Sequence, residues 1–165
     1  MPYDNKKFGG RTGSMNSNFT SYQKAQLPKG YLSGGYFEMI GDEKALRPEY
    51  IVAYAKEIAE KLDKPEEWDK FNSPQNKRSQ VRKFYEYVLR IQGLLQRKNN
   101  NFEVVEAELD RLIPFVNYAR SRSTVSELFQ IFVEENIRAI HSVEDLNAFV
   151  KHFESIVAYL PKEKN

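Results

Sequence analysis

Apolar side chains recur every three or four residues from about Pro48 to Leu160, the spacing that lines them up on one face of an α-helix. No stretch alternates apolar and polar residues for long enough to predict a strand. The pattern therefore predicts successive amphipathic helices. Their expected ranges are 48–62, 74–97, 102–113, 115–122, 124–137 and 142–160.

Residues that begin or end helices support these boundaries. Ser73 and Pro74 provide an N-cap and a first-turn proline for the long helix. Pro114 is expected to break or kink the third helix. Ser123 or Thr124 is expected to cap the next helix, with Glu127 in a capping box. Ser142 is expected to cap the last helix with Asp145 three residues on, and Pro161 ends it.

Residues 1–45 have a different character. They contain seven of the eight glycines together with many polar residues, and no helical period runs through them. We expect a flexible, basic, Gly-rich N-terminal arm (1–45) followed by a helical bundle domain (46–165). The fold class is all-α, a compact bundle of about five helices, because short connections favour antiparallel neighbours.

Composition narrows the classes of function. The chain has no cysteine and two histidines, so thiolate sites are excluded and no zinc-ligand spacing is present. No run approaches the roughly 18 apolar residues that span a bilayer, and residues 1–18 do not read as a secretory signal. We expect a cytoplasmic protein without a membrane partner, a metal or a cofactor.

Catalytic motifs are not recognisable. The chain has no phosphate-cradling glycine loop and no nucleophile elbow. Carboxylates that are adjacent in sequence, such as Glu134 and Glu135, point to different sides of a helix and do not form an acid–base pair. His141 and His152 are expected to be structural. We therefore expect no catalytic residue and no enzyme activity, with an enzyme of unrecognised site as the alternative.

Positive charge is concentrated in one segment. The formal net charge of the chain is only +2, yet residues 73–98 contain seven Lys or Arg residues and a single acid, Glu86. The remainder of the predicted bundle is mildly acidic. Such an asymmetry is typical of a local face that binds anions.

The long helix carries these cations on the side away from its apolar residues. At about 100° per residue, Arg82, Lys83, Arg90 and Arg97 lie opposite Val81. Lys77 and Arg78 sit in the first turn, where their long stems can reach outward. A row of cations with few acids is stabilised by a polyanion, whose phosphates release counterions on binding. The alternative is a solvated face.

A second basic cluster follows at a helix junction, formed by Tyr118, Arg120 and Arg122. Arginine suits bidentate phosphate contacts, and a tyrosine ring can stack on an unpaired base. The same arginines can instead cap the carbonyls at the end of the third helix. Both interpretations stay open on the sequence.

Three stretches resemble the small subunit of the Csm-type (type III-A) CRISPR effector complex. Residues 79–84 (SQVRKF) open the long helix, residues 112–122 (LIPFVNYARSR) surround the second basic cluster, and residues 145–160 (DLNAFVKHFESIVAYL) form the last helix. In order and spacing they cover about residues 47–160. The arm before residue 46 departs from the family's compact pattern.

The resemblance implies a non-catalytic, all-helical subunit of an RNA-guided complex, present in several copies. Its implied partners are target RNA and crRNA, contacted through the backbone, other copies of itself, the crRNA-holding backbone subunit and the large polymerase-like subunit. Arg82 and Arg122 match the family's arginines best, and Lys77, Arg78, Lys83 and Arg120 are neighbours chosen by charge. The alternatives are a protein–protein interaction scaffold and the small subunit of a Cmr-type (type III-B) complex.

Overall fold

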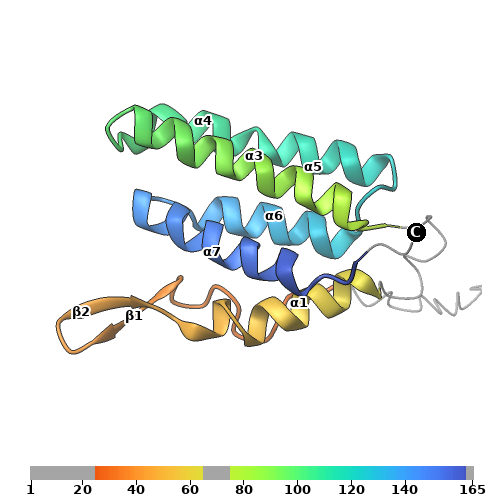
Figure 1. The fold of residues 1–165 in the computed structure, drawn as a ribbon, viewed down its shortest axis with the longest axis horizontal. Helices are drawn as coiled ribbons and strands as arrows, with labels where there is room; N and C mark the ends of the chain where they lie inside the picture. The colour runs from red at the N-terminus through yellow and green to blue at the C-terminus, as the bar shows by residue number, and fades with distance from the viewer. Residues whose placement is uncertain (1–24, 65–74, 163–165) are drawn as a thin grey trace, which may run out of the picture.

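The computed structural model describes residues 25–64 and 75–162. Within these ranges the chain forms a two-stranded hairpin, a short 3-10 helix and six α-helices (Figure 1). Their bounds are β1 Phe37–Ile40, β2 Glu43–Leu46, the 3-10 helix Pro48–Tyr50, α1 Ala53–Asp63, α3 Arg78–Arg97, α4 Phe102–Asp110, α5 Leu112–Ser121, α6 Glu127–Ala139 and α7 Val143–Tyr159.

The helices are arranged in three layers (Figure 1). Helices α6 and α7 form the middle layer, α3, α4 and α5 cover one side of it, and α1 with the hairpin covers the other. Within this arrangement α3 packs on α7 and on α4, α5 packs on α6, and α1 packs mainly on α7. The predicted all-helical bundle is confirmed.

Phenylalanine rings fill the space between α6 and α7. Phe129 and Phe132 of α6 and Phe149 and Phe153 of α7 are fully buried. The ring centroids of Phe132 and Phe153 lie 5.3 Å apart in an edge-to-face arrangement, and those of Phe149 and Phe153 lie 5.6 Å apart. Such aromatic pairs add to the burial of apolar area, so these rings form the centre of the core.

The predicted break in the third helix is present. Helix α4 ends at Asp110 and α5 begins at Leu112, so the chain turns just before Pro114 rather than at it. Pro114 then occupies the first turn of α5, where a backbone N–H has no partner within the helix and its loss costs little. The proline therefore fits the start of α5.

Four helix starts differ from the sequence prediction. Helix α1 begins at Ala53, after a 3-10 helix that starts at Pro48, and α5 begins at Leu112 rather than at residue 115. Helix α3 begins at Arg78 rather than near residue 74, and the expected cap at Ser73 and Pro74 lies outside the described residues. Helix α6 is capped by Ser126, whose Oγ accepts from the backbone N–H of Phe129. The prediction of Ser123 or Thr124 is wrong, because these residues end α5 instead.

The turn after α5 explains why Ser123 and Thr124 do not cap α6. Ser123 has a left-handed backbone with φ 57°. Its N–H donates to the carbonyl of Arg120, and the N–H of Thr124 donates to that of Ala119. This pair of bonds is the Schellman pattern that satisfies the last carbonyls of a helix.

The cap of the last helix is confirmed. The Oγ of Ser142 accepts from the N–H of Asp145 at 3.1 Å. The Asp145 carboxylate reaches back to the N–H of His141, one residue earlier than in the capping box that the sequence predicts. These two bonds satisfy one N–H group in the first turn and one just before the cap.

The expectation of no strand is wrong for the β1–β2 hairpin, in which Phe37 pairs with Leu46 and Ile40 with Glu43. Each strand has only four residues, too few to establish an alternating pattern in the sequence. Gly41, with φ 63°, allows the two-residue turn between the strands. The hairpin ends with residues that lead directly into the 3-10 helix.

A buried chain of hydrogen bonds joins residues 25–50 to the bundle. Asn136 on α6 accepts from the Tyr36 hydroxyl at 2.7 Å and donates to the Tyr31 hydroxyl at 2.8 Å. Tyr31 in turn lies 2.7 Å from Nε2 of His152 on α7, whose Nδ1 bonds the Tyr50 carbonyl. Because a carbonyl only accepts, Nδ1 carries the hydrogen and Nε2 accepts from Tyr31.

The part of the predicted arm that the structure describes, residues 25–45, therefore contacts the bundle, and residues 1–24 lie outside the described ranges. Tyr36 is 1% exposed and lies within the core, whereas residues 38–44 of the hairpin are exposed. The division of the chain into an arm and a bundle domain at residue 46 stays a prediction.

Replacing Asn136 by Ala should lower the free energy of unfolding by about 2–4 kcal/mol, because it leaves two buried tyrosine hydroxyls without their amide partner. Urea unfolding followed by circular dichroism measures the change. The control is Asn147→Ala on α7, which removes only an exposed bond to Gln92 and should cost less than about 0.5 kcal/mol. Equal losses in both variants would contradict the role given to the buried network.

Stability should fall as the pH drops below about 6.5, because burial lowers the pKa of His152 to about 4. The unfolded chain then takes up a proton that folded His152 does not, so the folded state loses about 2 kcal/mol between pH 7 and pH 5. Urea titrations at both pH values measure the loss. In His152→Gln this part of the pH dependence should disappear, and an unchanged pH dependence would contradict the assignment.

Candidate nucleic-acid interface

An open groove of about 590 Å³ runs between α3 and α5 on the outer layer of the bundle. It forms because α3 rests on α7 whereas α5 rests on α6, so the two helices do not pack directly along their length. From α3 the lining residues are Gln80, Lys83, Phe84, Glu86, Tyr87 and Arg90. From α5 and the turn that follows they are Leu112, Phe115, Tyr118, Ala119, Arg122 and Thr124.

Asn76 fixes the position of α3 relative to the turn between α5 and α6. Its side-chain nitrogen donates to Ser126 Oγ at 2.8 Å and to the Leu62 carbonyl at 3.1 Å, and its oxygen accepts from the Ser126 N–H. The backbone N–H of Asn76 also donates to the Thr124 carbonyl. These buried bonds hold the start of α3 beside the residues that close the groove at Arg122.

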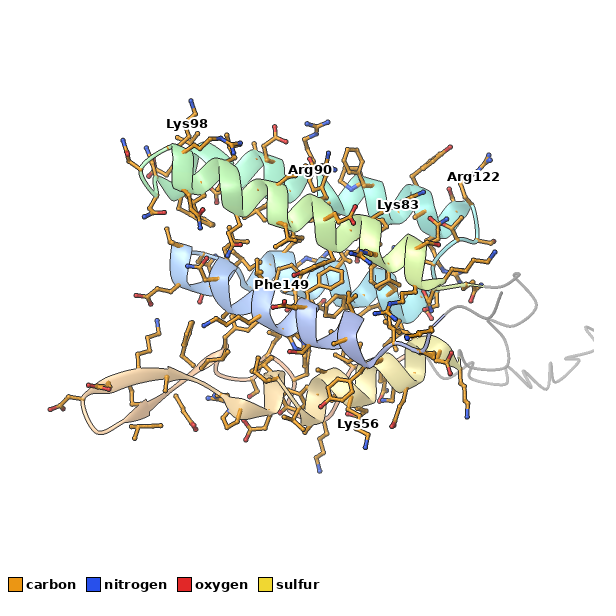
Figure 2. The ribbon with its side chains drawn as sticks, in the orientation of Figure 1. Lys56, Lys83, Arg90, Lys98, Arg122 and Phe149 are labelled. Atoms are coloured by element: carbon orange, nitrogen blue, oxygen red, sulfur yellow. The ribbon has the colours of Figure 1, made fainter. Side chains whose placement is uncertain are left out.

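Three cations surround the groove: Lys83 and Arg90 from α3, and Arg122 from the end of α5 (Figure 2). All three side chains are exposed. Lys83 and Arg90 are seven residues apart, which aligns them on one side of α3 about 10 Å apart along its axis. Within the described ranges no carboxylate lies at ion-pair distance from any of them.

Among the residues that the structure describes, one acid lines the groove, and it forms an ion pair with a neighbour. Glu86 forms an i,i+4 ion pair with Arg82, with the Arg82 Nε 3.2 Å from the carboxylate. Both side chains are more than half exposed, so the pair contributes little to stability. The ion pair offsets the negative charge of Glu86. The groove therefore carries more positive than negative charge.

Aromatic rings form much of the groove wall. Tyr118 is 65% exposed and Phe115 is 39% exposed. The Phe115 and Tyr87 ring centroids lie 5.5 Å apart, edge to face. The Arg122 guanidinium lies 6.0 Å from the Tyr118 ring, and that of Arg90 lies 5.3 Å from the Tyr87 ring. Two of the cations therefore lie over aromatic rings of the groove, an arrangement that fits a charged ligand with planar groups.

Glu108 on α4 binds two residues next to this aromatic wall, Tyr87 and Arg111. It accepts from the Tyr87 hydroxyl at 3.1 Å and from Arg111 Nη1 at 3.0 Å. Burial raises the pKa of Tyr87 above its ordinary value, so the hydroxyl stays protonated and can donate. The Arg111 guanidinium covers Phe115 at 5.3 Å from the ring centroid. The positions of both rings are thereby fixed by neighbouring helices.

The remaining predicted site residues lie elsewhere. Arg82 is exposed beside the groove and paired with Glu86. Arg97 is the exposed last residue of α3, beyond the groove lining, and Arg120 is half-buried in the last turn of α5. Lys77 and Arg78 line a different cavity, of about 340 Å³, with residues from the ends of α1 and α7. The nine predicted residues thus do not form one continuous surface.

Sequence reasoning missed Tyr87, Phe115 and Arg111. Tyr87 lies on the cationic side of α3, and the sequence analysis assigns Phe115 only to the helix that continues after Pro114. The available signal was the pair Phe115 and Tyr118, two large rings three residues apart that share a face of α5 with Arg111 and Arg122.

The described residues provide no other obvious chemical centre. They contain no group of three or more His, Asp or Glu side chains placed to hold a metal ion. His152 is fully buried and takes part in the hydrogen-bond chain described above. None of the described helices is long and apolar enough to cross a membrane.

Comparison with known families agrees with the resemblance seen in the sequence. Residues 45–162 match the model of the family described as Csm2 Type III-A. No curated protein and no solved structure matches the chain. The family match covers all of the α-helices described above and both sides of the groove. The chain therefore belongs to the Csm2 Type III-A family, the small structural subunits of type III-A CRISPR Csm complexes.

Proposed function

We propose that this subunit binds target RNA, paired to the crRNA guide or single-stranded, through the groove between α3 and α5, and catalyses no reaction itself. The observation that carries the proposal is the set of three cations, Lys83, Arg90 and Arg122, around one groove without carboxylate partners among the described residues. Unpaired cations held close together repel one another, and a polyanion relieves that repulsion.

The types of side chain suit contacts to the sugar-phosphate backbone. Lysine and arginine contact phosphates in any sequence, so the subunit would grip RNA while the guide reads the bases. The proposed phosphate contacts are accordingly Lys83, Arg90 and Arg122, with Arg82 and Arg97 flanking them on α3. Tyr118 lines the same groove beside Arg122. Lys77 and Arg78 belong to another surface and have a smaller proposed role.

The opposite side of the bundle fits protein neighbours better than RNA. Met39 and Ile40 at the hairpin tip are each 64% exposed, and Val52 before α1 is 54% exposed. Apolar side chains in such positions favour contacts with other subunits over contacts with phosphates. We propose that the other copies, the crRNA-holding backbone subunit and the large subunit are contacted through surfaces outside the groove.

Replacing Lys83, Arg90 and Arg122 together by Gln should weaken binding to single-stranded RNA and flatten its salt dependence. Each lost phosphate contact lowers the slope of log affinity against log salt by about 0.7. Fluorescence anisotropy with a labelled oligouridylate over a range of salt concentrations measures both quantities.

The control is Lys56→Gln, an exposed lysine of α1 on the far side of the bundle (Figure 2), compared with each single variant Lys83→Gln, Arg90→Gln and Arg122→Gln, which removes the same one charge. Lys56→Gln should leave the affinity and the slope unchanged. A protein–protein interaction module would instead show no RNA affinity at any salt, and that result would overturn the proposal.

Replacing Glu86 by Gln should strengthen RNA binding about two- to fivefold at low salt, because it removes the one acid among the described residues that lines the groove and frees Arg82. The same anisotropy titration measures the gain. Glu60→Gln, an exposed acid of α1, changes the net charge equally and should have little effect. If both variants gain equally, net charge and not the groove determines the affinity.

A further inference from the structure

The groove contains side chains that a contact with phosphate alone does not need. A phosphate needs only the cations, yet the wall between them is made of aromatic and apolar side chains, among them Phe84, Leu112, Phe115 and Tyr118. Tyr118 exposes 65% of its surface and Phe115 exposes 39%. Large rings left exposed inside a concave site indicate a surface that binds an apolar or planar partner.

The shape of the site suits a planar group. A groove of about 590 Å³ falls within the size range of pockets that hold small organic ligands. The Tyr118 ring lies at its wall with one guanidinium, that of Arg122, 6.0 Å from the ring centroid. A nucleobase can stack on the exposed face of such a ring, and arginine adds a cation–π contribution.

The positive charge around the site limits which planar ligands can bind there. Lys83, Arg90 and Arg122 favour a ligand that brings negative charge on both sides of its planar group, which describes a nucleotide within a chain. A base inside a duplex is already covered on both faces by its neighbours and cannot stack on a side chain. The ligand that satisfies both the rings and the cations is therefore an unpaired nucleotide.

We propose that the groove accepts one unpaired base of the bound RNA, stacked on Tyr118, while the flanking phosphates contact Lys83, Arg90 and Arg122. This inference rests on the proposed function and assigns the subunit a base-stacking site in addition to its backbone contacts. Because every base has a flat face, the site tolerates any sequence.

The test compares two RNAs on the full-length protein: a labelled oligouridylate and a ribose-phosphate chain of equal length that lacks every base. Three proteins are titrated by fluorescence anisotropy, namely the wild type, Tyr118→Ala and Tyr118→Phe. Wild-type protein should bind the oligouridylate about tenfold more tightly than the abasic chain. Tyr118→Ala should lose that preference and bind both chains equally, whereas Tyr118→Phe should keep it.

Salt dependence separates this inference from the proposed function. Tyr118→Ala should keep the wild-type slope of affinity against salt, because it removes no phosphate contact. Equal binding of both chains by the wild type, or an equal loss on both chains in Tyr118→Ala, overturns the stacking site while backbone binding stands. Absence of salt-dependent binding to either chain overturns both.

Discussion

The layer of phenylalanine rings between α6 and α7 is the centre of the core, on which the outer helices pack. Phe129, Phe132, Phe149 and Phe153 interlock there with centroid distances between 5.3 and 6.2 Å. Large rings hold two helices further apart than small residues do. Because α3 is seated on α7 and α5 on α6, the separation of the middle helices carries over to the outer layer and opens the groove.

The groove stays positively charged because the acidic side chains near it bind other residues. Glu86 is paired with Arg82, and Glu108 is bound to Tyr87 and Arg111. Glu134 and Glu135 on α6 pair with Arg138 of their own helix. Local pairs of this kind are weak, yet they keep the carboxylates away from Lys83, Arg90 and Arg122. A small net charge on the whole chain is thus compatible with a strongly basic groove.

Much of the fold could be predicted from the sequence, because helical periodicity and capping residues are local signals. The stripe through Val81, Val88 and Leu95 and the cap at Ser142 are of this kind. The hairpin and the packing of Tyr31 and Tyr36 could not be predicted, because their partners Asn136 and His152 lie about 100 or more residues away. A glycine-rich segment gives no hint of such distant bonds.

The candidate site was predictable only in part, for a similar reason. Periodicity correctly placed Lys83 and Arg90 on the outer side of α3, and the residue types singled out Tyr118 and Arg122. Neither signal could show that Lys83 and Arg90 face the same groove as Tyr118 and Arg122. Their common position depends on the helices against which α3 and α5 pack. Arg82, which the sequence resemblance singled out together with Arg122, forms an ion pair with Glu86 beside the groove.

The most direct test of the account is to map where RNA touches the protein. Full-length protein is irradiated with a short RNA that carries 4-thiouridine, and the cross-linked peptides are identified by mass spectrometry. The account predicts cross-links in α3 and α5, concentrated around Phe115 and Tyr118. Cross-links concentrated in α1 or the hairpin, or spread evenly over the bundle, would contradict it.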